Sequence, residues 1–226
     1  MIRVHVICEG QTEEMFVKEV ISGALVPRQI YVFPSIVGKP GHRGGNVRVE
    51  RLFTDVRNKL RQDRNAYCTT FFDLYGLAGD FPGLVTARQK IRSREKARHL
   101  QGSIMEYFRQ HDLEDNELVR FLPYVQMHEF EGLLFSDAAG LARGLNQPAM
   151  QHRLEQIRHA FASPEDINDG STTAPSKRIA ALFSGYEKPL FGSLAAIEIG
   201  LDAIRRECPL FNEWISQIES LSSGEH

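Results

Sequence analysis

The N-terminal segment constrains the fold of this chain more than any other stretch. Residues 2–8 alternate between apolar and polar side chains and end in an apolar pair, which predicts a half-buried β-strand. Glu9 and Gly10 interrupt the pattern, and residues 16–24 then place apolar side chains at helical spacing. We therefore predict a strand that ends at an acidic side chain, followed by a helix with Thr12 as its N-cap.

A second acidic residue follows a predicted strand in the same way. Residues 66–72 are apolar and rich in strand-forming side chains, and Asp73 comes directly after them. A further strand is predicted over residues 30–37, and a helix over residues 47–62. Alternating strands and helices favour a parallel sheet that is covered by helices. Because the carboxyl ends of parallel strands share one edge, Asp73 is expected to meet Glu9 there.

These strand-end acids indicate a metal site. Two carboxylates that lie close together repel each other unless a proton or a cation lies between them. Oxygen ligands without histidine or thiolate suit Mg²⁺ or Mn²⁺ rather than zinc. Glu9 and Asp73 are thus predicted as catalytic residues and metal ligands. A fourth strand, predicted over residues 119–127, precedes Glu129, a candidate for both roles, and Glu131, a candidate ligand. The alternative for each acid is an ordinary turn or capping residue.

The ordered motifs resemble the Toprim (topoisomerase–primase) domain, in an uncharacterised branch associated with bacterial defence nucleases. Glu9-Gly10 matches the glutamate motif of that family, and Asp73 matches the first aspartate of its Asp-x-Asp pair. Tyr75 stands where the second aspartate is expected. The resemblance covers roughly residues 1–140. It implies a Rossmann-like, mostly parallel sheet flanked by helices, and hydrolysis of nucleic-acid phosphodiester bonds with Mg²⁺ or Mn²⁺.

The resemblance also implies partners. Nucleic acid, either DNA or RNA, is the expected substrate, and a separate ATPase and a second copy of the chain are candidate partners. Since Tyr75 replaces an acid, the alternative function is a catalytically degenerate subunit that binds nucleic acid or the partner ATPase. Fold analogy alone does not decide between an active and a degenerate site.

Several basic residues are candidate contacts for nucleic acid. The net charge of the chain is -2, so a nucleic-acid surface must be local. A helix predicted over residues 87–108 would place Arg88, Arg92 and Lys96 on one stripe. A solvated helix face is the alternative for that stripe. The full set of candidates is Lys39, Arg43, Arg88, Arg92, Lys96, Lys177 and Arg178.

The change of pattern along the chain predicts the domain organisation, and the cysteines predict the compartment. We expect a Toprim-like α/β core over residues 1–144 and a helical C-terminal extension over residues 145–226, with Trp214 anchored in the core. The three isolated cysteines indicate neither a disulfide framework nor a zinc ribbon, so a reducing cytoplasm is expected. A strand that begins at residue 2 leaves no room for a signal peptide, and no apolar run is long enough to cross a bilayer.

Overall fold

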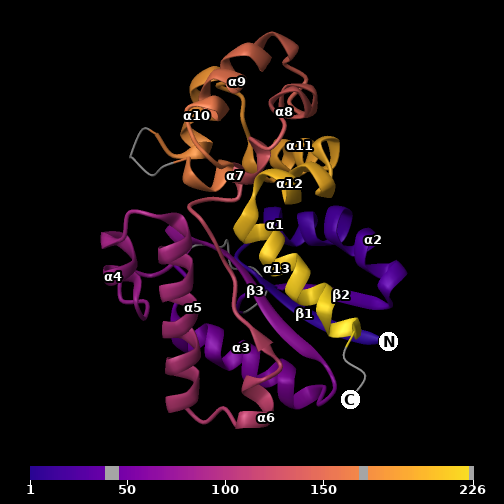
Figure 1. Ribbon diagram of the computed structural model, residues 1–226, viewed down its shortest axis with the longest axis vertical. Helices are drawn as coiled ribbons and strands as arrows, with labels where there is room; N and C mark the ends of the chain where they lie inside the picture. Colours follow the sequence, from indigo (N-terminus) through magenta and orange to yellow (C-terminus); the bar gives the residue numbers. More distant parts are fainter. Residues whose placement is uncertain (39–45, 168–172, 224–226) are drawn as a thin grey trace.

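The computed structural model describes residues 1–38, 46–167 and 173–223. Within them lies a parallel five-stranded sheet of order β2-β1-β3-β4, in which β5 also pairs with β3 (Figure 1). The strands are β1 (Ile2–Cys8), β2 (Ile30–Ile36), β3 (Tyr67–Asp73), β4 (Phe121–Leu122) and β5 (Val125–Gln126). The predicted α/β class, a parallel sheet flanked by helices with a helical C-terminal region, is thereby confirmed.

Helices cover both faces of the sheet and form most of the C-terminal region (Figure 1). Two π-helical turns, η1 (Val17–Ile21) and η6 (Lys188–Gly192), follow α1 and precede α11. No helix of the described ranges has the length and apolar character that crossing a membrane requires. The α-helices are α1 (Gln11–Phe16), α2 (Ser22–Leu25), α3 (Val49–Gln62), α4 (Leu84–Gln89), α5 (Ser93–Gln110), α6 (Asp115–Leu118), α7 (Glu131–Leu134), α8 (Ala138–Gly144), α9 (Gln151–His159), α10 (Pro175–Leu182), α11 (Ser193–Ile199), α12 (Leu201–Glu207) and α13 (Pro209–Ser220).

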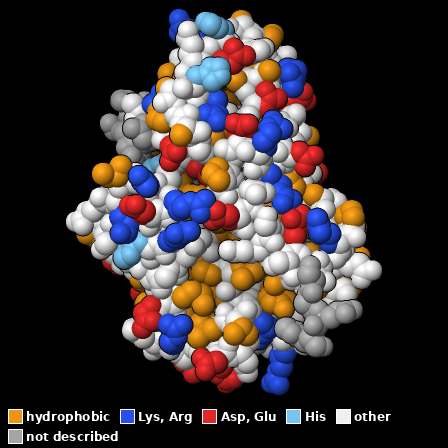
Figure 2. Space-filling view, viewed as in Figure 1, with side chains coloured by type: hydrophobic (Ala, Val, Ile, Leu, Met, Phe, Trp, Pro, Cys, Tyr) orange, Lys and Arg blue, Asp and Glu red, His pale blue; other side chains and the backbone are white. Residues whose placement is uncertain are grey.

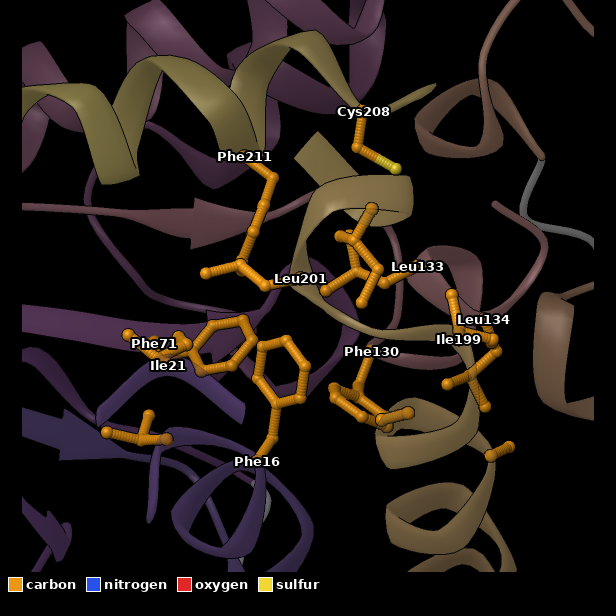
Figure 3. Close-up of a cluster of buried hydrophobic side chains, with 14 of the residues drawn as sticks. Phe16, Ile21, Phe71, Phe130, Leu133, Leu134, Ile199, Leu201, Cys208 and Phe211 are labelled. Carbon is orange, nitrogen blue, oxygen red and sulfur yellow. The ribbon is translucent and has the colours of Figure 1, made fainter. Parts of the chain in front are cut away.

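Two apolar cores lie on opposite faces of the sheet. Successive side chains of a strand point to opposite faces, so neighbours such as Phe71 and Phe72 of β3 enter different cores. Phe71 meets Phe16 of α1, Phe130 and Phe211 of α13, as Figure 3 shows. Phe72 lies in the core that is covered by α3 and α5. The first core also includes α7, α8, α11 and α12, and so it joins the C-terminal helices to the sheet.

The C-terminal helix α13 crosses the sheet and is fixed to it by Trp214 (Figure 1). The indole ring stacks on Tyr124 with a centroid distance of 4.5 Å, and its Nε1 donates to Thr69 Oγ1 at 2.8 Å. Trp214 is thus anchored both by aromatic stacking and by a buried hydrogen bond. This confirms the prediction that Trp214 is a core anchor.

The prediction of one strand over residues 119–127 is wrong, because the structure has the short strands β4 and β5 there. Pro123 lies between them and has no N–H to donate to a neighbouring strand. At this point the Thr70 hydroxyl, and not a backbone group, bonds to the neighbouring segment: it donates to Tyr124 O at 2.7 Å and accepts from Tyr124 N at 2.8 Å. The strand is therefore interrupted, but its two parts keep their place beside β3.

The prediction of one helix over residues 87–108 is also wrong. The chain is extended at Lys90 and Arg92, between α4 and α5. Ser93 Oγ lies 2.9 Å from Glu165 O and 2.7 Å from Asp166 Oδ1, so long-range contacts fix the start of α5. Arg88 lies on α4, which removes it from the predicted stripe.

The predicted N-cap of the first helix is displaced as well. Gly10, and not Thr12, is the N-cap of α1. The backbone N–H of Gly10 donates to Glu13 Oε2 at 2.9 Å, which turns the Glu13 side chain back toward the end of β1.

Candidate active site

The first two predicted acids meet at the carboxyl edge of the sheet. β1 and β3 are parallel neighbours, with Cys8 opposite Phe71. Glu9 follows β1 and Asp73 ends β3, so both emerge at the same edge. The backbone N–H of Asp73 donates to Glu9 Oε2 at 3.0 Å. The strand order therefore brings together two residues that are 64 positions apart in the sequence.

The Glu9 carboxylate has room at this edge because residue 76 is glycine. A Cβ atom on Gly76 would lie 1.9 Å from Glu9 Oε2 and 2.3 Å from Glu9 Cδ. Any larger residue at position 76 would therefore displace the Glu9 side chain. The glycine that follows β3 therefore makes room for the acid that follows β1.

Lys188 enters the same site from the C-terminal region. Its Nζ lies 3.1 Å from Asp73 Oδ2, 3.1 Å from Glu131 Oε2 and 4.0 Å from Glu13 Oε1. Tyr186 OH donates to Glu131 Oε1 at 3.3 Å. We call Glu9, Glu13, Asp73, Glu131 and Lys188 the acid–lysine cluster.

Burial shifts the protonation of the cluster. It raises the pKa of Glu9 to about 8, and the nearby charges of Asp73 and Glu13 add to the effect. Burial likewise raises the pKa of Glu13 and of Glu131 to about 7, and it raises that of Asp73. Burial lowers the pKa of Lys188, but the facing carboxylates outweigh this and raise it. One ammonium thus lies among four carboxyl groups with raised pKa values, of which those of Glu9, Glu13 and Glu131 are about 7 to 8.

The residues of the cluster fit a divalent cation by their chemistry. All four acids offer carboxylate oxygens, which are the ligands that Mg²⁺ and Mn²⁺ prefer. Asp73 Oδ1 is buried and makes no hydrogen bond within the described residues. As the side chains stand, no three His, Cys, Asp or Glu residues of the described ranges are arranged to hold a metal ion. Between Asp73 and Glu131 lies the Lys188 ammonium, which supplies the positive charge in this arrangement.

The third acidic group is divided between two environments. Glu131 belongs to the acid–lysine cluster, whereas Glu129 Oε2 accepts from the backbone N–H of Ser176 at 2.9 Å, in the first turn of α10.

Tyr75 OH lies 3.4 Å from His128 Nδ1. Burial lowers the pKa of His128 to about 4, so its ring is neutral at pH 7. Tyr75 therefore contacts a neutral histidine.

The predicted basic residues lie in different places. Arg92 and Lys96 line one pocket at the start of α5, where Figure 2 shows that Lys and Arg side chains gather. Arg88 is exposed on α4, outside that lining. Lys177 is exposed on α10, and the neighbouring Arg178 lies with its guanidinium 5.3 Å from the centroid of a phenylalanine ring. The remaining two candidates, Lys39 and Arg43, fall outside the described residues.

Three residues of the site were not predicted from the sequence. Glu13 is one of them, and its side chain turns back toward the end of β1 because it accepts from the Gly10 N–H. Lys188 is 115 positions from Asp73, and Tyr186 lies in the same turn of the C-terminal region. Nothing in their local sequence distinguishes them from ordinary turn residues.

Two solved structures of the C-terminal region of the OLD protein from Xanthomonas campestris pv. campestris are similar to this chain. The structure phased with iodine has 14% identity and a TM-score of 0.38, covering 99% of this chain and 97% of that one. The structure phased with platinum has 15% identity and a TM-score of 0.37, covering 96% and 95%. No curated protein matches significantly. The model of a domain of unknown function, DUF4276, matches residues 8–219, and the chain therefore belongs to the DUF4276 family.

Proposed function

We propose that this chain hydrolyses phosphodiester bonds of nucleic acid with the help of Mg²⁺ or Mn²⁺. The observation that carries the proposal is the acid–lysine cluster, in which four carboxyl groups, three of them buried, gather at the carboxyl edge of a parallel sheet. Ligands of α/β proteins commonly bind at this edge. The ordered acidic motifs resemble those of the Toprim domain, whose members act on phosphodiesters with divalent metals.

The roles of the residues follow from their chemistry. Glu9 and Asp73, with Glu13 or Glu131, would hold the cation, and the Asp73 N–H keeps the Glu9 carboxylate in place. When bound, the metal supplies an activated water and stabilises the negative charge that develops on the phosphate. Lys188 holds a positive charge beside the same acids and can pair with a phosphate oxygen of the substrate.

Glu129 has a supporting role in this proposal. Its carboxylate joins the strand-end segment to the start of α10 through Ser176 N. It also lies near enough for its charge to raise the pKa of Asp73. Glu129 would therefore tune and position the cluster, and a direct role at the metal would require it to leave Ser176.

The test is a cleavage assay on labelled single-stranded DNA, duplex DNA and RNA, with Mn²⁺ or with EDTA. Glu9→Gln and Asp73→Asn should each lower the Mn²⁺-dependent rate by about 100-fold or more, because each removes a ligand charge. The matched control is Glu14→Gln, a partly exposed acid that pairs with Lys18 on the same helical segment. The assignment would be refuted if cleavage persisted in both site variants, or if the control variant lost cleavage to the same extent as they do.

A second candidate function is a degenerate subunit that binds nucleic acid or a partner ATPase without cleaving. Two observations favour it: Tyr75 replaces the second aspartate, and Lys188 already neutralises part of the cluster. This candidate predicts that the wild-type protein binds neither Mn²⁺ nor Mg²⁺ and retains nucleic acid uncut. The cleavage assay and a metal titration therefore distinguish the two functions.

A further inference from the structure

A pocket of about 780 Å³ opens beside the first turn of α5, outside the acid–lysine cluster. Its basic lining residues are Lys90, Arg92, Arg94 and Lys96. His128 forms part of the wall and also lies beside Tyr75, two residues after the Asp73 of the cluster. The pocket therefore lies beside the segment that carries the candidate active site, with His128 in its wall.

Lys96 is the central observation in this pocket. The residue is only 7% exposed, and no hydrogen bond or ion pair joins its side chain to another residue of the described ranges, although the charge of Asp166 acts on it. Burial lowers the pKa of Lys96 because part of the hydration of its charge is lost, and the charge of Asp166 offsets this only in part. A largely buried lysine side chain without a hydrogen-bonded or ion-paired partner is typical of a site that binds an anion.

The acidic residues of the same wall are engaged elsewhere. Glu165 accepts from the backbone N–H groups of Leu210 and Phe211, at the start of α13. The carboxylate of Asp166 lies 2.7 Å from Ser93 Oγ. Both acids thus have hydrogen-bond partners and neither forms an ion pair with Lys96, although the charge of Asp166 lies near enough to act on the lysine.

The helix that carries Lys96 adds a second source of positive potential. α5 is 18 residues long, and no described side chain caps its N-terminus. The first N–H groups of a helix have no intrahelical acceptor, and the helix dipole favours an anion at this end. Arg92, at the N-cap position, is exposed on the rim and has no ion pair with another described residue.

We propose that this pocket binds a backbone phosphate of the nucleic acid, other than the phosphate at which cleavage occurs. The inference rests on the proposed function for its choice of substrate. The pocket supplies a largely buried lysine, an exposed guanidinium and a helix N-terminus, which are the groups that bind phosphate backbones. Since the net charge of the chain is -2, a local site of this kind is needed to hold a polyanion.

The experiment measures binding without turnover. Fluorescein-labelled oligodeoxythymidylate is titrated with the full chain in EDTA at several salt concentrations, and anisotropy is recorded. Lys96→Met should weaken binding about tenfold at low salt, as expected for one charge-assisted contact. It should also lower the slope of log K against log salt by about 0.7, the loss of one single-strand phosphate contact. Inorganic phosphate should compete with the oligonucleotide in wild type.

Two further variants keep the test decisive. Arg92→Gln should also weaken binding and lower the salt slope. Because Arg92 is exposed on the rim, this result does not depend on whether the buried variant Lys96→Met folds. Arg98→Gln is the control, since Arg98 is exposed on the same helix but outside the lining of the pocket. Lys96→Met should be as stable as wild type or more stable, whereas a purely structural lysine would make the variant less stable.

The outcomes are separable from those of the cleavage assay. Binding that depends on Lys96 and Arg92 supports the phosphate site even if no cleavage is found, in which case only the proposed hydrolysis fails. Wild-type binding that neither variant weakens, or the absence of any binding by wild type, overturns the phosphate site. Equal losses in the Arg98 control would also overturn it, because they would show a diffuse charge effect.

Discussion

The ion pairs of Lys188 lead to a quantitative prediction for the metal-free protein. Lys188→Met removes the one ammonium that lies between Asp73 and Glu131, while both carboxyl groups stay in place. The remaining acids then repel one another in a buried site. We predict that this variant is less stable than wild type above neutral pH, and that the deficit shrinks as the pH falls.

The magnitude follows from the exposure of the partners. Removing one partner of a fully buried ion pair costs about 3–5 kcal/mol, and an exposed pair contributes less than about 1 kcal/mol. The Asp73 and Glu131 side chains are 4% and 0% exposed, but that of Lys188 is 36% exposed, so water replaces part of its charge. We therefore expect a loss of about 2–3 kcal/mol at pH 8.

The number of protons bound to the folded protein determines the sign of the pH dependence. Without the ammonium, the pKa values of the cluster acids rise further, so the folded variant binds more protons than folded wild type between pH 5.5 and 8. More protons bound in the folded state mean that stability increases as the pH falls. At pH 5.5 the deficit should therefore be below about 1 kcal/mol. Saturating Mn²⁺ should reduce it at pH 8, since a cation replaces the lost charge.

The assay is urea unfolding at pH 8 and pH 5.5, followed by the fluorescence of Trp214, the single tryptophan of the chain. Lys177→Met, at an exposed lysine of α10, is the matched control and should change stability by less than about 0.5 kcal/mol. If Lys188→Met were as stable as wild type at pH 8, or if its deficit were the same at both pH values, the electrostatic account of the cluster would be refuted.

Three further predictions concern single positions. Gly76→Ala should abolish Mn²⁺-dependent cleavage because its Cβ displaces Glu9, whereas Gly79→Ala, with no atom within 4 Å of the new Cβ, should retain full activity in the same assay. Burial raises the pKa of Glu165 from 4.5 to about 7, so the stability of wild type should fall as the pH rises through that range. Urea unfolding should show this fall to be smaller in Glu165→Gln by up to about 3 kcal/mol. Trp214→Phe should lose about 1–2 kcal/mol with its buried hydrogen bond, measured by urea unfolding and circular dichroism.

The sheet and the meeting of its first two acids were predictable from the sequence. Residues 2–8 and 66–72 have clear strand patterns, and parallel strands with acids at their carboxyl ends bring those acids to one edge. The adjacency of β1 and β3 confirms the strand order that this prediction required. The periodicity of the sequence was thus sufficient to predict those elements whose structure depends on their own side chains.

The remainder depends on contacts that no local pattern encodes. Lys188 reaches Asp73 across 115 positions, and its neighbours in the sequence are those of an ordinary turn. The break before α5 depends on Ser93 bonding to Glu165 and Asp166, more than 70 residues later. In both cases tertiary packing, and not helix or strand propensity, determines the geometry.

Calorimetric titration of the purified protein with Mn²⁺ at pH 7 tests the central claim most directly. The account predicts that wild type binds Mn²⁺ and releases protons, visible as a heat that depends on the buffer, because the pKa of Glu9 is about 8 and those of Glu13 and Glu131 are about 7. Glu9→Gln and Asp73→Asn should each remove the binding. Absence of binding in wild type, or binding that both variants retain, would contradict the assignment of this cluster as a metal site.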